Sequence, residues 1–236
     1  MRKKDKRKIP KEPRIKEFTK SPLGRKEKRL KRIEKEFRKG FDFLEKYEKA
    51  ATIFGTARYG FDDEIYQKAE KLSAMLADRG YAVITGGGPG VMEAANKGAH
   101  SVKGTSVGIN IQLKAIKEDK NKYVQESESF KYFFSRKMML AYASQLYFFF
   151  PGGFGTLDEF FEMVTLIQTE KIKPIPIILV QKSYWEPLLE WISDELVKNK
   201  AINPDDMDIY RLVDTPEEAI EVAEELLEGK TATTAS

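Results

Sequence analysis

The spacing of apolar positions along the chain changes near Ala51. Before this point, apolar residues recur every three or four positions among many charged ones, which predicts an amphipathic helix from about Lys26 to Glu48. Three prolines within the first 22 residues argue against one continuous helix in that part. The apolar face of the expected helix consists of Leu30, Ile33, Phe37, Phe41 and Leu44.

From Ala51 onward, short apolar runs alternate with amphipathic segments, as strands and helices do in α/β proteins. The segment 62–80, for example, has Ile65, Leu72 and Leu76 at helical spacing and ends at Gly80. The expected strands are 51–55, 81–88, 105–111, 122–129, 145–150, 174–180 and 208–214, and the expected helices are 62–80, 90–99, 130–144, 156–171, 183–197 and 216–229.

The run "QLYFFF" at 145–150 is apolar on both faces of the expected strand. Strands of this kind, alternating with helices, are typical of a parallel sheet that is covered on both sides. The sequence therefore predicts an α/β fold, a Rossmann-like parallel sheet with helices on both faces, plus a basic N-terminal helical arm. We expect three regions: the arm at 1–49, partly helical, a nucleotide-binding domain at 50–230, and a disordered tail at 231–236.

Composition narrows the possible chemistry. The 236 residues include no cysteine, so disulfides, thiolate catalysis and cysteine-based zinc sites are excluded. The single histidine, His100, argues against a histidine-based triad and against a multi-histidine metal site. We expect His100 to interact with the end of a helix rather than to act as a catalyst. The chain has neither a membrane-spanning apolar run nor a secretory signal, and we expect a cytoplasmic protein without membrane contact.

Charge is distributed unevenly between the arm and the rest of the chain. Residues 1–40 hold 19 Lys and Arg against 6 Asp and Glu, whereas the remainder holds 22 against 31, for a net charge of +4. A solvated arm explains this pattern, and so does an arm that binds RNA, DNA or another polyanion. No aromatic residue precedes Phe18 among the basic ones, which weakens a base-stacking role and favours the solvated arm.

Two glycine-rich segments follow expected strands, "TGGGPG" at 85–90 and "PGGFGT" at 151–156. In parallel sheets, ligands bind beyond the carboxyl ends of the strands, and consecutive glycine N–H groups at a helix start can hold a phosphate. Neither segment has the spacing of an ATP-binding P-loop or of a dinucleotide fingerprint.

Each segment also has a purely structural interpretation. Thr156 and Glu159 have the spacing of a helix capping box, in which Thr156 caps the helix and Glu159 reaches back. The first segment is explained by a tight turn with Pro89 at the helix start and Glu93 in the first turn. Two such turns in one chain are better explained by a shared phosphate site.

Four motifs in order resemble those of the LOG family, the cytokinin riboside 5′-monophosphate phosphoribohydrolases, formerly labelled lysine decarboxylase-like. "PGGFGTLDE" is similar to the family signature, and "GGGPGVMEAANKGA" to its other glycine segment. "FFSRKMMLAYAS" matches the helix with an Arg-Lys pair, and "IFGTARYG" resembles the first-strand segment, with Thr56 in place of the usual serine. The resemblance covers about residues 50–182 and gives no support to the first 40.

The resemblance implies hydrolysis of the N-glycosidic bond of a nucleoside 5′-monophosphate, of AMP or cytokinin riboside type, to free base and ribose 5-phosphate. It implies Glu159 and Arg136 as catalytic residues, although the apolar spacing of Phe133 and Phe134 alone would leave Arg136 at a solvated position. No metal and no cofactor are expected. The expected substrate-binding residues are Gly55, Thr56, Gly86, Gly87, Gly88, Glu93, Lys137, Gly152, Gly153, Gly155 and Thr156.

The partners expected are a nucleoside monophosphate and, by the resemblance, further copies of the chain in a dimer or larger homo-oligomer. The alternative function is a nucleotide-binding or carrier protein without catalysis, since similar folds occur in molybdenum-cofactor carriers and DNA-processing proteins. In that case residues 1–40 would provide contacts with nucleic acid.

Overall fold

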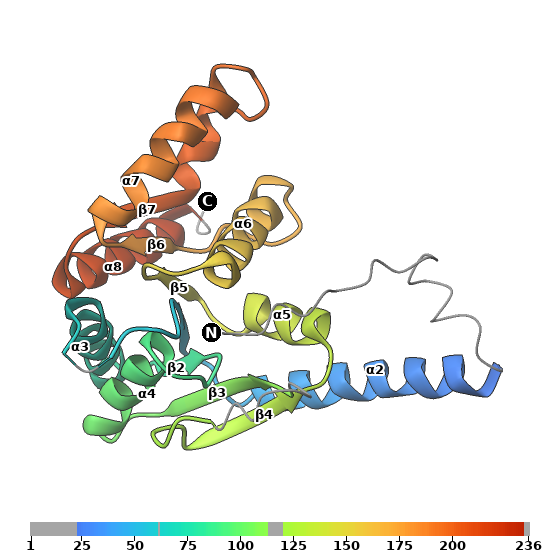
Figure 1. Ribbon diagram of the computed structural model, residues 1–236. Helices are drawn as coiled ribbons and strands as arrows, with labels where there is room; N and C mark the ends of the chain where they lie inside the picture. The colour runs from blue at the N-terminus through green and yellow to red at the C-terminus, as the bar shows by residue number, and fades with distance from the viewer. Residues whose placement is uncertain (1–22, 61, 113–119, 234–236) are drawn as a thin grey trace, which may run out of the picture.

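The structure is a computed structural model that describes residues 23–60, 62–112 and 120–233. Within these residues, seven parallel strands form one sheet in the order β4-β3-β2-β1-β5-β6-β7, shown in Figure 1. This confirms the α/β fold with a Rossmann-like parallel sheet. The strands are β1 Ala50–Phe54, β2 Ala82–Thr85, β3 Ser106–Ile111, β4 Glu126–Phe130, β5 Leu146–Phe149, β6 Ile177–Val180 and β7 Tyr210–Val213.

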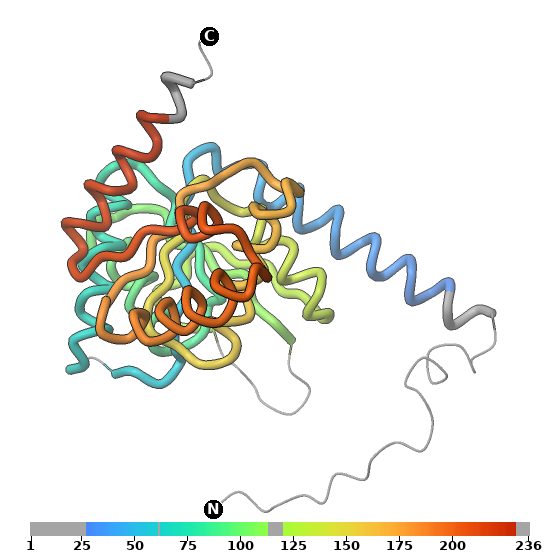
Figure 2. Tube along the Cα trace, turned by 90° about the horizontal axis from the view of Figure 1, so that it is seen from above, coloured from blue at the N-terminus to red at the C-terminus, as the bar shows by residue number. Residues whose placement is uncertain are grey.

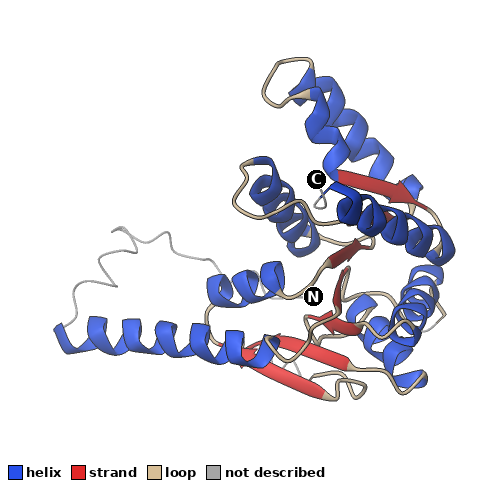
Figure 3. Cartoon of the chain, turned by 180° about the vertical axis from the view of Figure 1, so that it is seen from behind, coloured by secondary structure: helices blue, strands red, loops and turns tan. Residues whose placement is uncertain are grey.

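Helices cover both faces of the sheet (Figure 3). Helices α3, α4 and α8 pack with one face in a single apolar cluster, and α2, α5, α6 and α7 pack with the other. The helices are α2 Leu23–Leu44, α3 Glu64–Asp78, α4 Val91–Ser101, α5 Phe133–Tyr142, α6 Phe154–Gln168, α7 Lys182–Trp191 and α8 Pro216–Thr233, with a π-helix at Ile192–Val197 and a 3₁₀-helix at Pro204–Ile209.

The centre of the sheet is apolar on both sides, as predicted from "QLYFFF". In β5, Phe148 belongs to the cluster under α3, α4 and α8, while Tyr147 and Phe149 belong to the opposite cluster. All four β5 residues are buried. Because successive side chains of a strand point to opposite faces, this one strand contributes to both cores.

The sheet reverses its direction of growth between β1 and β5. From β1 the chain adds β2, β3 and β4 on one side, then returns to pair β5 with the other side of β1. At such a switch point the loops after the two central strands diverge and leave a crevice at the carboxyl edge. The loop after β1 and the turn after β5 both start at this crevice.

Helix α2 is only partly an arm. Its N-terminal half extends away from the body in two perpendicular views (Figures 1 and 2), whereas Gly40 and Leu44 near its end are buried. Lys39 forms a 2.5 Å ion pair with Glu128 of β4. The expected arm boundary at residue 49 therefore cuts off a helix that packs on the sheet, and residues 1–22 lie outside the described residues.

Glu36 of α2 holds the start of α5. One carboxylate oxygen accepts a 3.0 Å hydrogen bond from the backbone N–H of Lys131, and the other accepts a 2.7 Å bond from the Ser135 hydroxyl. Tyr132, the N-cap of α5, provides no side-chain cap of its own. A carboxylate at a helix N-terminus stabilises unpaired N–H groups, so α2 fixes the position of α5.

The core face expected for α5 was wrong for Phe133 and Phe134 and right for Ala141. Phe133 and Phe134 are 58% and 49% exposed. The buried residues of the helix are Ser135, Met139, Leu140 and Ala141. Phe134 lies outside the core against Phe37 of α2 and against Tyr132, with ring centroids 6.5 Å and 5.3 Å apart.

Other boundaries differ by a few residues from those expected. Strand β4 begins at Glu126 instead of residue 122, because residues 120–125 form a turn held by Asn121. Helix α8 continues to Thr233, three residues into the expected tail, and residues 234–236 lie outside the described residues. Among the described helices, none has the length and apolar character needed to cross a bilayer.

Replacing Gly40 by valine should destabilise the fold. A Cβ at this position would lie 2.8 Å from Cγ of Met139 and 3.0 Å from a ring carbon of Phe130, both in the core. We expect Gly40→Val to lower the free energy of unfolding by about 1–3 kcal/mol, as overpacking does. Urea denaturation of the variant and the wild type would measure this difference in the free energy of unfolding.

The matched control is Gly229→Val in α8, where an added Cβ meets no atom within 4 Å. Equal stability of the two variants would contradict the close packing of α2 on α5.

Candidate active site

The loop after β1 joins both glycine segments. The backbone N–H of Thr56 donates a 3.0 Å hydrogen bond to the carbonyl of Pro151, and the carbonyl of Thr56 accepts a 2.9 Å bond from the N–H of Val91. Gly90 has a φ of 72°, and a Cβ there would overlap the backbone of Thr56 and Ala57. The two glycine segments therefore meet at one edge of the sheet.

The first glycine turn lies on a buried polar network. Gly87 has a φ of 73°, and its N–H donates to the Thr85 hydroxyl at 2.9 Å. The Asn121 side chain donates to the Gly88 carbonyl and to Asn96, each at 3.0 Å. These two asparagines were missed from the sequence; the available signal was Asn96, a polar residue on the apolar side of its helix.

The second glycine turn starts α6 without a side-chain cap. The N-cap is Gly153, and the helix begins at Phe154. Thr156 is thus the third helical residue and Glu159 lies in the second turn, so the capping-box interpretation was wrong. A Cβ on Gly152 would overlap the side chain of Thr156, which is 5% exposed. Glycine at this position therefore lets the turn fold tightly over Thr156.

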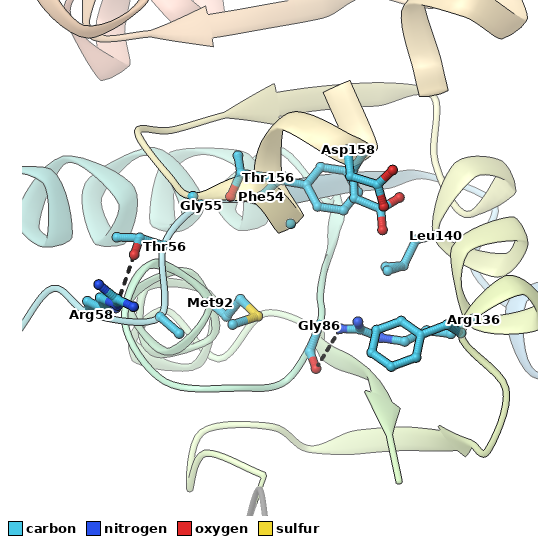
Figure 4. Close-up of a pocket in the computed structure, with 15 residues that line it drawn as sticks. Phe54, Gly55, Thr56, Arg58, Gly86, Met92, Arg136, Leu140, Thr156 and Asp158 are labelled. Atoms are coloured by element: carbon cyan, nitrogen blue, oxygen red, sulfur yellow. Dashed lines mark hydrogen bonds between the residues drawn. The ribbon is translucent and has the colours of Figure 1, made fainter. Parts of the chain in front are cut away.

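A cavity of about 320 Å³ opens where the loops meet (Figure 4). Its walls combine turns after β1, β2 and β5 with the starts of α4 and α6 and one side of α5. Four of the lining residues carry charge, and several others are large and apolar. The lining residues are Phe54, Gly55, Thr56, Ala57, Arg58, Gly86, Met92, Phe133, Arg136, Leu140, Gly153, Gly155, Thr156, Asp158 and Glu159.

Arg136 is fixed in the cavity wall. Its Nε donates a 2.8 Å hydrogen bond to the carbonyl of Ile109 within β3, and a terminal nitrogen lies 3.5 Å from the Gly86 carbonyl. A Cβ on Gly86 would overlap that guanidinium. The solvated position suggested by helix spacing alone does not hold, because Gly86 leaves room for Arg136 to reach the sheet.

Glu159 is a carboxyl group whose proton affinity is strongly altered. Burial raises its pKa to about 8, Lys137 and Arg136 act against this, and Glu162 and Asp158 add to it. The carboxyl therefore lies among two cations and two other acids. Perturbed carboxyl groups of this kind gather at functional sites.

Lys137 points to other acids. Its Nζ lies 2.7 Å from Asp158 and 3.3 Å from Glu162. Burial alone would lower the pKa of Lys137. The hydrogen bond to Asp158 and the negative charges of Glu159 and Glu162 raise it by more, so the net shift of the pKa is upward. Lys137 therefore supplies positive charge next to Glu159 from behind the cavity wall.

The structure brings together most of the expected site residues. Eight of them line the cavity: Gly55, Thr56, Gly86, Arg136, Gly153, Gly155, Thr156 and Glu159. Gly87, Gly88, Glu93, Lys137 and Gly152 are not among its lining residues.

Glu93 lies close enough to Tyr66 of α3 for its negative charge to act on the phenol. Burial is the larger cause of the raised pKa of Tyr66, and the charge of Glu93 adds to it. Sequence reasoning missed Arg58, Met92 and Asp158 as lining residues. His100 stands in the last turn of α4, as expected. Within the described residues, no cluster of three or more His, Cys, Asp or Glu side chains is arranged to hold a metal ion.

Comparisons with known proteins agree with the motifs. The family model described as possible lysine decarboxylase matches residues 92–223. The chain is 31% identical over 165 residues to the probable cytokinin riboside 5′-monophosphate phosphoribohydrolase LOGL2 of Oryza sativa subsp. japonica, covering 69% of this chain and 67% of that protein. It is 26% identical over 162 residues to the cytokinin riboside 5′-monophosphate phosphoribohydrolase of Mycobacterium tuberculosis, covering 66% and 84%.

Solved structures share the fold. The X-ray structure of the structural genomics target TM1055 has 25% identity and a TM-score of 0.59, over 75% of this chain and 99% of that chain. The molybdenum cofactor binding protein of Rippkaea orientalis has 20% identity and a TM-score of 0.57, over 76% and 97%. At this identity the second match shows the fold alone.

The raised pKa of Glu159 predicts a pH-dependent gain in stability for Glu159→Gln. Between its ordinary pKa of 4.5 and about 8, the folded chain holds a proton that the unfolded chain lacks. The stability from this proton is complete below pH 4.5 and is lost as the pH rises to about 8.

The glutamine variant loses none of this stability. Its melting temperature relative to the wild type should therefore increase by roughly 2–4 °C or more from pH 5 to pH 8.5, as about 1 kcal/mol gives in a chain of this size. Thermal denaturation at the two pH values measures the difference, with Glu225→Gln on the exposed side of α8 as control. A difference that does not vary with pH would contradict the burial argument.

Proposed function

Because this chain belongs to the LOG family, whose family model is described as possible lysine decarboxylase, we propose that it hydrolyses the N-glycosidic bond of a nucleoside 5′-monophosphate. The observation that carries this proposal is one cavity lined by a glycine turn at a helix start, a perturbed carboxyl group and an anchored arginine. The products are a free base and ribose 5-phosphate.

The phosphate belongs at the start of α6. Gly153 and Gly155 line the cavity, and the first N–H groups of the 15-residue helix have no partners within the helix. These groups and the positive end of the helix dipole attract an anion. The Thr56 and Thr156 side chains add hydroxyl donors on the same wall.

Glu159 lies three residues after Thr156 and therefore on the same side of α6. A phosphate at the helix start places the attached ribose toward this carboxylate. As the bond between C1′ and the base nitrogen breaks, positive charge grows on the sugar, and the Glu159 carboxylate stabilises it. A water oxygen then bonds to C1′, and the water gives up one proton while the departing base gains one.

Arg136 lies in the cavity wall and contacts the substrate from the side opposite Glu159. Its anchoring at Ile109 and Gly86 leaves the guanidinium with little freedom, so it is preorganised. Its positive charge lowers the pKa of Glu159 and thereby favours the carboxylate form that the reaction needs. Phe54, Met92 and Leu140 form apolar walls suited to the flat face of a base.

Incubation with AMP should release adenine and ribose 5-phosphate. Glu159→Gln removes the charge that stabilises the sugar cation, and Arg136→Ala removes its oriented partner, so each should lower kcat by roughly 100-fold or more. Chromatography of the released base measures the rate.

Arg32→Ala on the exposed side of α2 is the matched control and should retain wild-type activity. Tight AMP binding without any released base would instead support a carrier without catalysis. Full activity of Glu159→Gln would contradict the assignment of this carboxylate.

The pH dependence of the reaction should follow Glu159. Since the carboxylate is the active form and its pKa is about 8, kcat/KM for AMP should rise about tenfold per pH unit below that value and level off above it. Measurements start above about pH 6.5, where the phosphate is already a dianion. A rate that falls as the pH rises through 8 would mean that Glu159 acts as an acid.

A further inference from the structure

Arg58 stands between two neighbouring hollows. The 320 Å³ cavity and an adjoining hollow of about 580 Å³ share Thr56, Arg58 and Gly153 as lining residues. The second hollow is otherwise walled by Tyr59, Gly152, Phe154, Leu157 and Tyr184. Arg58 therefore lies at the junction, where the turn after β1 meets the glycine turn that starts α6.

The backbone next to Arg58 is fixed while its side chain is available. The Arg58 N–H lies 3.3 Å from the Thr56 hydroxyl, and Thr56 itself is bonded to Pro151. Arg58 is an exposed residue, and among the described parts of the chain its guanidinium takes part in no hydrogen bond or ion pair that the structure shows. Arg58 therefore has a fixed backbone and an exposed guanidinium, an arrangement that suits the binding of an anionic ligand.

The other cations near the cavity are already engaged. Arg136 is bonded to Ile109 and Gly86, and Lys137 is paired with Asp158 and Glu162. Figure 4 shows Arg58 beside Thr56 on one side of the cavity and Arg136 beside Gly86 on the other. The two arginines thus serve opposite ends of whatever binds between them.

The chemistry of the Arg58 end fits a phosphate dianion. Gly153 places the start of α6 at the same junction, so backbone N–H groups and a guanidinium converge there. A planar guanidinium can donate two parallel hydrogen bonds to phosphate oxygens. The Glu159 end offers no comparable excess of positive charge, because Arg136 and Lys137 are offset there by three acids, Asp158, Glu159 and Glu162.

We propose that Arg58 binds the 5′-phosphate of the substrate and makes the site select nucleoside monophosphates over nucleosides. This assignment rests on the proposed function. It fixes the direction of the substrate, with the phosphate at the junction of the two hollows and the sugar at Glu159. The backbone groups of the glycine turn alone would give a weaker preference, because they carry no net charge.

The test compares the binding of AMP and adenosine, which differ only in the phosphate. Titration calorimetry uses chains that carry Glu159→Gln, so that bound AMP is not consumed. In this background AMP should bind more tightly than adenosine. Adding Arg58→Gln should weaken AMP binding by roughly 10- to 100-fold, the range for a charged hydrogen-bonded contact. Adenosine binding should stay within about twofold, which also shows that the variant is folded.

Two further variants sharpen the result. Arg58→Lys keeps the charge but not the paired donors, and should recover part of the AMP affinity. Arg32→Gln on the exposed side of α2 removes the same charge far from the cavity and should change neither affinity. Equal losses for AMP and adenosine, or no loss for either, would overturn the assignment.

Failure of this inference can be told apart from failure of the proposed function. If the wild-type chain releases no base, the affinities of AMP and adenosine still decide whether Arg58 binds the phosphate. If base is released and Arg58→Gln leaves the preference for AMP intact, the hydrolase stands and the Arg58 assignment falls.

Discussion

The site depends on two backbone hydrogen bonds of a single residue. Thr56 donates to Pro151 of one glycine turn and accepts from Val91 at the end of the other. The strands on either side of β1 alone would allow several distances between the two glycine turns. The two hydrogen bonds of Thr56 fix that distance. Gly90 makes the approach possible, since any side chain there would strike the backbone of Thr56 and Ala57. The lack of a side chain at Gly90 thus determines the shape of a cavity that is built from three loops.

Within that cavity, stability and chemistry make opposite demands on Glu159. Burial favours the neutral acid and raises its pKa to about 8, whereas the proposed stabilisation of a sugar cation needs the carboxylate. Arg136 and Lys137 restore part of the charged form, and Glu162 and Asp158 act against them. A partly buried acid among mixed charges costs folding free energy, and sites of this kind are where proteins commonly accept such a cost.

The sequence determines the local patterns well and the contacts between distant segments poorly. Apolar runs such as Phe148 to Phe150 were enough for a parallel sheet, and parallel strands bring their following turns to one edge. Thr156 misled because a capping-box spacing cannot tell which residue starts the helix; the glycine turn started it two residues earlier. Phe133 misled because helical spacing cannot distinguish an apolar side chain of the core from one that lines an open cavity, as Phe133 does. Arg58 has no local signal at all, since the role proposed for it depends on a junction of loops.

The charged N-terminal segment illustrates how one helix can serve two environments. The N-terminal half of α2 extends outward, and on the exposed side of the helix salt bridges such as Arg38 to Glu34 lie in solvent, where they contribute little. The C-terminal half places Glu36 at the start of α5, where its carboxylate accepts hydrogen bonds from Lys131 and Ser135. Arg136 follows in the same turn, and its N–H donates to the carbonyl of Tyr132. Arg136 is therefore held at both ends, by Ile109 at its guanidinium and by α2 through its helix. A segment that composition alone would class as a solvated arm contributes to the rigidity that the proposed chemistry requires.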